Sequence, residues 1–323
     1  MERTTLGRTG LQVSVAGLGC GGSSSIGMGT GKSRKESIAV VRTALDLGIN
    51  LIDTAARYGT EEIVGEAIAA VPRDSFFIST KARAHEDRAE DPLPPADLVD
   101  SLEASLRRLG TDTIDVFHVH GVLPQHYEHV REAVVPALLA EKDKGKFRHL
   151  GITEYASVDT GQDMLARAVE DDCWDVIMVA FHMMNQIPSK RIFTHTRRLG
   201  IGTLNMFAVR DIFSNPERLR EAMRELAADG RVPERFAADD DPLAFLVHAS
   251  GATSIMDAAY RFARHEPGVD VVLTGTGDLD HLRANVASIL KPPLPAADLA
   301  TLREVFGGLA GVGLDPPTAP RHD

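Results

Sequence analysis

Short apolar runs alternate with longer amphipathic stretches along almost the whole chain, and this alternation constrains the fold more than any other feature. Eight runs have the length of buried strands: VAGLGC (15–20), NLID (50–53), FFISTK (76–81), IDVFHVH (114–120), FRHLGIT (147–153), DVIMVAF (175–181), IGTLNMF (201–207) and VDVVLTG (269–275). Because strands separated by helices pair in parallel, the pattern predicts one parallel sheet. Eight such units in 323 residues fit a closed (β/α)₈ barrel, or TIM barrel, in the α/β class.

The stretches between the runs carry helix signals. Leucines at helical spacing form one apolar stripe: Leu98, Leu102, Leu106 and Leu109. Thr60, followed by Glu61 and Glu62, predicts a helix that starts with Thr60 as its N-cap. Residues 127–144 also have a helical pattern, but Pro136 lies among them, so we predict that this helix is kinked or split.

The interval between the seventh and eighth runs, roughly sixty residues, is too long for one helix. We therefore predict a long insertion there, on a loop that could shape a substrate pocket. An extra C-terminal helix is expected after the eighth unit. Residues 1–313 are predicted to form a single barrel domain, and the Pro-rich residues 314–323 a loose C-terminal tail.

Composition limits the partners. The chain has 46 acidic and 35 basic residues, a formal charge of −11, which argues against binding nucleic acid or an anionic membrane. No signal peptide or membrane-spanning window is found. The two cysteines, Cys20 and Cys173, form no disulfide framework, so we expect a cytoplasmic protein with a small-molecule partner. Nothing in the sequence indicates the oligomeric state.

Four polar residues follow or end three consecutive strands: Asp53, Tyr58, Lys81 and His120. In a barrel of parallel strands, the carboxyl ends of the strands share one rim, where reactive groups gather. A phenol beside a protonated lysine can give up a proton, because the lysine lowers its pKa. A carboxylate keeps the lysine charged, and a neutral imidazole can orient an oxygen. This set suits hydride addition to a carbonyl with a nicotinamide cofactor.

Each of these residues also has a simpler reading. Asp53 and Lys81 could be only a buried ion pair, Tyr58 a loop aromatic that packs on the insertion, and His120 a strand-end histidine. Found together at successive strand ends, the four favour a catalytic role.

The chain resembles the aldo-keto reductases. The matching segments are 43–68 (TALDLGINLIDTAARYGTEEIVGEAI), 76–82, 101–120 (SLEASLRRLGTDTIDVFHVH), 144–153 (KGKFRHLGIT) and 271–286 (VVLTGTGDLDHLRANV), in the order and spacing of that family. The resemblance implies that Tyr58 is the general acid and that Lys81 lowers its pKa. It also implies that Asp53 pairs with Lys81 and that His120 orients the carbonyl.

The resemblance further implies an extended dinucleotide across the barrel mouth, without a Rossmann fold. Where family members hold the nicotinamide with a Ser-Asn pair and a Gln, this chain has Thr153, Glu154 and Met178; Asp53 also borders the nicotinamide. Met206 or Phe207 falls where an aromatic ring stacks on the nicotinamide.

At the adenosine end, the predicted cofactor contacts are Gly275, Thr276, His281 and Asn285. Many relatives have Lys and Arg where Gly275 and His281 stand, to bind the 2′-phosphate of NADP, and here Arg283 and Asp278 lie nearby. We expect NADPH as the cofactor, with NADH as the alternative.

Other functions stay open. Related enzymes oxidise sugars with NAD, so an aldose 1-dehydrogenase is the first alternative to aldehyde or ketone reduction. His118 and His120 form an HxH pair that could serve a metal-dependent barrel hydrolase, although no metal site is predicted. A non-catalytic or sensory role is a further alternative, since some members of the family resemble channel-associated subunits. His118 itself is read either as a core histidine with a partner or as a support for His120.

Overall fold

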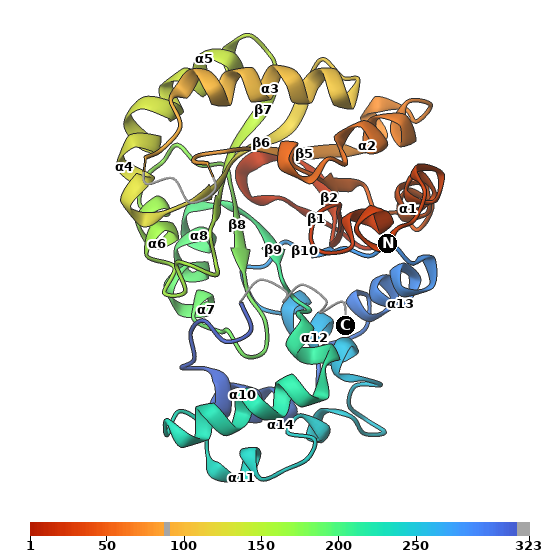
Figure 1. The fold of residues 1–323 in the computed structure, drawn as a ribbon, viewed down its shortest axis with the longest axis vertical. Helices are drawn as coiled ribbons and strands as arrows, with labels where there is room; N and C mark the ends of the chain where they lie inside the picture. Colours follow the sequence, from red (N-terminus) through yellow and green to blue (C-terminus); the bar gives the residue numbers. More distant parts are fainter. Residues whose placement is uncertain (87–90, 315–323) are drawn as a thin grey trace.

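The computed structural model describes residues 1–86 and 91–314, and they contain the predicted barrel (Figure 1). Eight parallel strands close in the order β10-β3-β4-β5-β6-β7-β8-β9. Their bounds are β3 Ala16–Gly19, β4 Leu51–Asp53, β5 Phe77–Arg83, β6 Ile114–Val122, β7 Phe147–Glu154, β8 Val176–Ala180, β9 Gly202–Met206 and β10 Val271–Thr274. All eight predicted strands are present, each within two residues of its predicted bounds.

Helices cover the outside of the barrel (Figure 1). They are α1 Arg34–Asp46, α2 Glu61–Ile68, α3 Pro95–Leu109, α4 Tyr127–His129, α5 Val135–Asp143, α6 Asp163–Ala168, α7 Pro188–Arg191, α8 Phe193–Leu199, α12 Ile255–Arg264 and α13 Leu279–Ile289. The leucine stripe of α3 is buried, as its spacing predicted. The helix around Pro136 is split, because a π-helical turn, Val130–Val134, separates α4 from α5.

The helix predicted after Thr60 is also present, as α2. Thr60 stands at its N-cap position, as predicted, but its side chain does not cap the helix. Its hydroxyl instead hydrogen-bonds Thr54 Oγ1 at 2.9 Å, because both side chains are buried behind the rim of the barrel.

An N-terminal hairpin that the sequence analysis missed closes the amino-terminal end of the barrel. Its strands, β1 Arg3–Thr5 and β2 Gln12–Ser14, pair antiparallel. Leu6 and Val13 are fully buried and pack with the apolar side chains that fill the barrel interior there. Three-residue strands of mixed polarity carry too little pattern to be recognised in the sequence.

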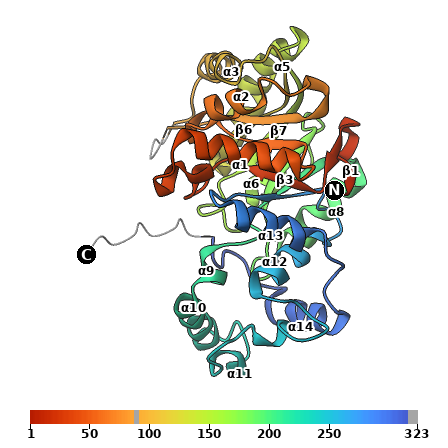
Figure 2. The ribbon, with the colours of Figure 1, turned by 90° about the vertical axis from the view of Figure 1, so that its right-hand side faces the viewer.

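The predicted insertion and extra C-terminal helix are present. The insertion contains α9 Asp211–Ser214, α10 Pro216–Ala228 and α11 Glu234–Ala237, and the extra helix is α14 Ala296–Phe306. Figures 1 and 2 both show α10, α11 and α14 together beside the barrel, at one end of the molecule.

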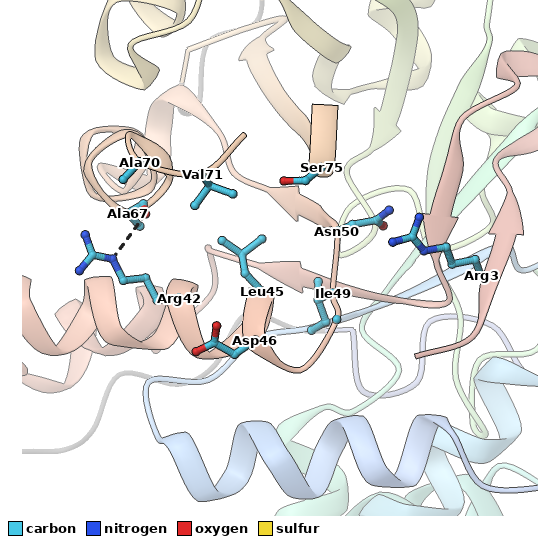
Figure 3. A pocket seen from close by; sticks show the side chains of 11 residues that line it. Arg3, Arg42, Leu45, Asp46, Ile49, Asn50, Ala67, Ala70, Val71 and Ser75 are labelled. Atoms are coloured by element: carbon cyan, nitrogen blue, oxygen red, sulfur yellow. Dashed lines mark hydrogen bonds between the residues drawn. The ribbon is translucent and has the colours of Figure 1, made fainter. Parts of the chain in front are cut away.

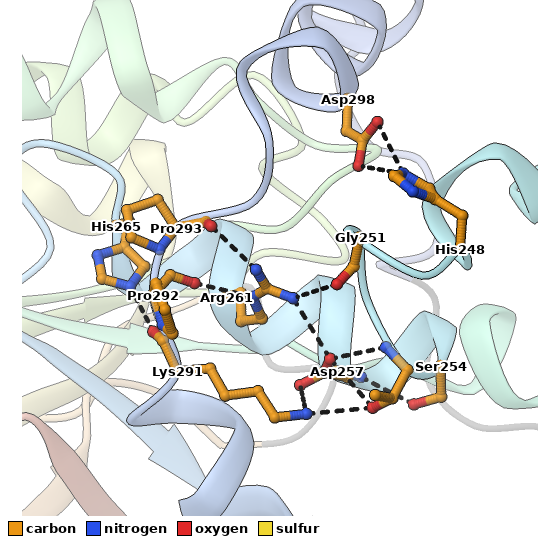
Figure 4. A network of polar contacts seen from close by, with 11 residues as sticks. His248, Gly251, Ser254, Asp257, Arg261, His265, Lys291, Pro292, Pro293 and Asp298 are labelled. Carbon is orange, nitrogen blue, oxygen red and sulfur yellow. Dashed lines mark hydrogen bonds and ion pairs between the residues drawn. The ribbon is translucent and has the colours of Figure 1, made fainter.

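A buried arginine ties this extension to the barrel wall (Figure 4). Arg261 of α12 donates hydrogen bonds to three backbone carbonyls, those of Gly251, Pro292 and Pro293, at 2.8–2.9 Å. Its guanidinium also lies 3.6 Å from Asp257. Since all three carbonyls belong to connecting segments, one side chain fixes the end of the insertion and the link to α14.

Leu314, which we assigned to the C-terminal tail, is buried against Ala156 and Ala180 at the barrel mouth. The rest of the predicted tail, 315–323, lies outside the described residues. Within the described chain, no helix has both the length and the apolar character needed to cross a membrane.

Candidate functional site

The four polar residues predicted from the strand ends lie together at the carboxyl-terminal rim of the barrel. Asp53 ends β4, Lys81 lies near the end of β5, His120 lies near the end of β6, and Tyr58 closes the 3₁₀ turn Ala56–Tyr58. We call these four residues the strand-end tetrad. Lys81 Nζ lies 5.2 Å from the centre of the Tyr58 ring, and the Tyr58 and His120 ring centres are 5.7 Å apart, edge to face.

Lys81 and Asp53 form a buried ion pair. Lys81 Nζ donates to both carboxylate oxygens of Asp53, at 2.7 and 2.6 Å, and to the carbonyl oxygen of Thr54 at 2.7 Å. Burial alone would lower the pKa of Lys81, but the carboxylate of Asp53 and, once it is ionised, the phenolate of Tyr58 outweigh this effect and raise that pKa above its usual value. The ammonium therefore stays charged beside the Tyr58 ring.

The pKa of Tyr58 differs in direction from the sequence-based expectation. Burial raises it, and Lys81 opposes this effect without reversing it, so the pKa lies above the usual value of a phenol. Lys81 therefore lowers the pKa of Tyr58, as expected, but desolvation is the larger effect, so the pKa does not fall below its usual value. At neutral pH the phenol keeps its proton.

His120 is a neutral imidazole, as expected. Burial first, and then the positive charges of Lys81 and Arg83, lower its pKa well below the usual value for histidine. A neutral ring carries a single N–H that can donate to an oxygen.

His118 has a polar partner in the barrel interior. Its Nε2 lies 3.1 Å from Ser79 Oγ, and the Ser79 hydroxyl donates to Asp53 Oδ1 at 2.7 Å. Since the hydroxyl hydrogen points to Asp53, Ser79 Oγ accepts from His118 Nε2–H. Gly151 on β7 makes room for this ring, because a Cβ there would lie 2.2 Å from His118 Nδ1. His118 is thus a core histidine with a partner.

Ser79 and Gly21 also contact the tetrad, and neither was predicted from the sequence. Ser79 lies two positions before Lys81 on the same face of β5, so the period of a strand could have revealed it. Gly21 packs against Tyr58, and a Cβ there would lie 2.5–2.8 Å from three ring carbons. No sequence signal identifies that contact.

The predicted nicotinamide contacts lie at the ends of β7 and β8. Thr153 Oγ1 accepts from the backbone N–H of Gly121 at 2.7 Å. Glu154 Oε1 accepts from Ala180 N at 2.6 Å and from the Gln162 amide at 3.2 Å, which leaves Oε2 without a partner. Burial raises the pKa of Glu154 to about 8, so at neutral pH the carboxyl is mostly protonated.

Met178, Met206 and Phe207 line the apolar part of the same region. Met178 is buried in the barrel interior, and Met206 borders it. Phe207 has a left-handed backbone, φ 68°, and the Arg210 guanidinium lies 4.1 Å from its ring centre. Arg210 also donates to the carbonyl oxygen of Gly313 at 3.0 Å, so the C-terminal segment and Phe207 are held together.

The predicted adenosine contacts lie on the loop after β10 and on α13. Thr276 is buried, and its Oγ1 accepts from Asp278 N at 3.1 Å. Asn285 donates to Thr274 Oγ1 at 3.0 Å. Gly275 and His281 are exposed. Because β10 and β3 are neighbours in the closed barrel, this loop lies next to the loop that carries Gly21.

A hollow of about 600 Å³ lies elsewhere, near the amino ends of the strands (Figure 3). Its walls come from α1, α2 and the segments before β4 and β5, with Arg3, Arg42 and Asp46 at its edge. It contains no member of the tetrad.

Metal binding has little support in this arrangement. Within residues 1–86 and 91–314, no three His, Cys, Asp or Glu side chains are grouped so that they could hold a metal ion. His118 Nε2 is already hydrogen-bonded to Ser79.

The geometry agrees with what comparison with known proteins shows. The family model described as "Aldo/keto reductase family" matches residues 17–306. L-galactose dehydrogenase of Arabidopsis thaliana is 27% identical over 317 residues, which cover 94% of this chain and 93% of that protein. Methylglyoxal reductase DkgB of Salmonella typhi is 38% identical over 134 residues, 41% of this chain and 48% of that protein.

Among solved structures, the holo form of aldo-keto reductase AKR11C1 from Bacillus halodurans aligns with a TM-score of 0.71. The alignment covers 100% of this chain and 99% of that one at 20% sequence identity, which supports the fold. The chain belongs to the aldo/keto reductase family and is an oxidoreductase.

Proposed function

We propose that the protein transfers a hydride between a nicotinamide cofactor and a small carbonyl or alcohol, with Tyr58 as the proton donor for reduction. The observation that supports this most is the position of Lys81, whose ammonium is fixed by Asp53 and lies 5.2 Å from the centre of the Tyr58 ring. A carbonyl that accepts a hydride needs one proton on its oxygen, and Tyr58 keeps its proton at neutral pH.

Each residue of the tetrad has a separate part in this proposal. Tyr58 gives its phenolic proton to the carbonyl oxygen, and the phenolate that forms is stabilised by the adjacent Lys81 charge. Asp53 keeps that charge in place. The neutral His120, whose ring stands roughly perpendicular to the Tyr58 ring, donates a hydrogen bond that orients the same oxygen.

The nicotinamide end of the cofactor would be held by Thr153, Glu154 and Phe207. When bound, the cofactor supplies or accepts the hydride. Glu154 Oε2 is a buried polar atom without a partner, and a carboxyl that titrates near pH 8 can donate to or accept from a carboxamide. The apolar surface of Met178 and Met206 would exclude water beside the ring.

Two substrate classes fit this chemistry, since the reaction is reversible. Aldehydes or ketones are the first, because proton donation by Tyr58 serves reduction. Sugars oxidised at the anomeric carbon are the second, because one relative that matches nearly the whole chain is named L-galactose dehydrogenase.

Steady-state turnover of the purified protein tests the proposal. NADH and NADPH are each combined with simple aldehydes and dicarbonyls, and NAD and NADP with aldoses. We expect turnover with at least one pair. Cofactor binding without turnover across the whole panel would contradict the proposed activity.

A further inference from the structure

The loop after β10 packs backbone against backbone on the loop after β3. A Cβ on Gly275 would lie 2.8 Å from the carbonyl oxygen of Gly19. A Cβ on Gly277 would lie 2.3 Å from the Cα of Gly27. Because both glycines face main chain, which cannot rotate away, position 275 accepts no larger residue while the two loops stay in place. The lysine that many relatives have there is excluded by the backbone itself.

A carboxylate occupies the start of α13. Asp278 is the N-cap, and its Oδ1 accepts from the backbone N–H groups of Asp280 and His281 at 2.9 and 3.0 Å. These two hydrogen bonds, that of His281 first, hold the pKa of Asp278 below its usual value, so the group is ionised at neutral pH. Two backbone N–H groups that could bind a phosphate at the start of this helix therefore already donate to the Asp278 carboxylate.

The two basic side chains at the start of α13, Lys32 and Arg283, each lie next to a carboxylate. Lys32, from the loop after β3, has its Nζ 4.0 Å from Asp278 Oδ2. Arg283 donates to Asp280 Oδ1 at 2.9 Å. The added positive charge of Lys32 and Arg283 thus balances Asp278 and Asp280, and a dianionic group would gain little net attraction.

We infer that this chain binds NAD(H) in preference to NADP(H), and that Asp278 is the residue that discriminates against the 2′-phosphate. The inference rests on the proposed function, and it reverses the preference expected from the sequence. A 2′-phosphate carries nearly two negative charges at neutral pH and would meet the Asp278 carboxylate without the usual lysine. A 2′-hydroxyl can instead donate to Asp278 Oδ2, as ribose hydroxyls do to carboxylates in other NAD sites.

Calorimetric titration of the full-length protein with NADH and NADPH tests this inference without using turnover. For the unmodified protein, the Kd for NADPH should exceed that for NADH by roughly tenfold or more, because like charges close together disfavour binding. Raising the salt concentration should narrow the ratio, since the discrimination is electrostatic.

Asp278→Asn is the informative variant, because asparagine is an equally good N-cap and leaves α13 intact. It should improve NADPH binding by roughly tenfold and weaken NADH binding by about threefold, because the amide nitrogen that replaces Oδ2 cannot accept from the 2′-hydroxyl. Asp280→Asn is the matched control, since this residue lies two positions away and is 93% exposed at its side chain. It should change the ratio of the two Kd values by less than about threefold.

The outcomes separate the two proposals. If the unmodified protein binds NADPH as tightly as NADH or more tightly, or if Asp278→Asn leaves the ratio unchanged, the inference is overturned while the proposed function stands. If neither dinucleotide binds, both are overturned.

Discussion

Asp53 and Glu154 are carboxyl groups at the ends of β4 and β7, and each is 3% exposed, but they differ in the partners that oppose the effect of burial on the pKa. Burial raises the pKa of Asp53, and the charge of the Lys81 ammonium, which donates to both carboxylate oxygens, opposes that rise. Glu154 meets only the neutral N–H of Ala180 and the amide of Gln162, and its pKa rises to about 8.

Two carboxyls that are buried to the same extent thus differ in their partners: a charged partner opposes the rise in pKa at Asp53, and only neutral donors oppose it at Glu154. At the tetrad, a fixed pair of charges lies beside the phenol that would release a proton. At the nicotinamide end, a mostly neutral carboxyl keeps one oxygen free. The Asp53–Lys81 pair has its hydrogen-bond partners without a ligand. Glu154 Oε2 has none, so a bound ligand could supply its hydrogen bond.

Lys81→Met should leave Asp53, like Glu154, as a buried carboxyl without a charged partner. Of the substitutions proposed, we expect this one to have the largest effect on stability and activity. Without the ammonium, Asp53 is a buried unpaired charge, so the free energy of unfolding should fall by about 3–5 kcal/mol unless the carboxyl takes a proton. The kcat for carbonyl reduction should fall about 10²–10⁴-fold. Urea unfolding and steady-state kinetics measure the two losses.

The double variant Lys81→Met/Asp53→Asn separates stability from activity. It should regain most of the lost stability, because no charge stays buried, and none of the activity. Full activity in either variant would show that Lys81 does not assist Tyr58.

Gly21→Ala tests whether the position of the phenol matters as much as its charge environment. The new Cβ would displace the Tyr58 ring, and misplacement by about 1 Å can reduce kcat by about 10²-fold. The Kd of the nicotinamide cofactor should change little. Gly308→Ala is the control, because a Cβ there meets nothing within 4 Å. Equal kcat values in both variants would refute the role of Gly21.

Ser79→Ala tests how much the hydrogen bonds from His118 to Ser79 and from Ser79 to Asp53 contribute to stability. The substitution removes a hydrogen bond to Asp53 and leaves the buried His118 Nε2–H without an acceptor. The free energy of unfolding should therefore fall by about 1–3 kcal/mol. Ser75→Ala serves as the control, since its exposed hydroxyl bonds only the carbonyl of Pro72. If the two variants unfold at the same urea concentration, the link through Ser79 contributes nothing.

Glu154→Gln should alter how stability depends on pH. Because the folded pKa of about 8 lies above the unfolded value near 4.3, the folded protein binds the extra proton between these values. Glu154 therefore contributes stability that is complete below pH 4 and is lost as the pH rises towards 8, by at most about 1.4 kcal/mol per unit. Urea titrations from pH 5 to 8 should show a flatter profile for the variant, and parallel profiles would contradict this charge state.

The sequence predicted the barrel well because eight buried strands leave a repeated apolar signal. It also predicted which side chains meet at the rim, since the topology brings the ends of β4, β5 and β6 together. The net direction of the Tyr58 pKa shift was not predictable, because desolvation depends on atoms from distant segments, such as Gly21, that pack against the ring.

The cofactor end was less predictable for a related reason. The sequence shows only that Gly275 stands where many relatives have a lysine. Its close contact with the Gly19 backbone depends on the pairing of β10 with β3, which the sequence does not show directly. The carboxyl of Glu154 was recognised as a possible acceptor, but its protonation depends on neutral partners from β8 and the loop before α6.

Tyr58→Phe tests the central claim most directly, with cofactor affinity and carbonyl reduction measured on the same preparation. We expect kcat for reduction to fall by about 10²-fold or more while the cofactor Kd stays within about twofold, because only the proton donor is lost. Reduction at an undiminished rate, with the cofactor bound as before, would contradict it.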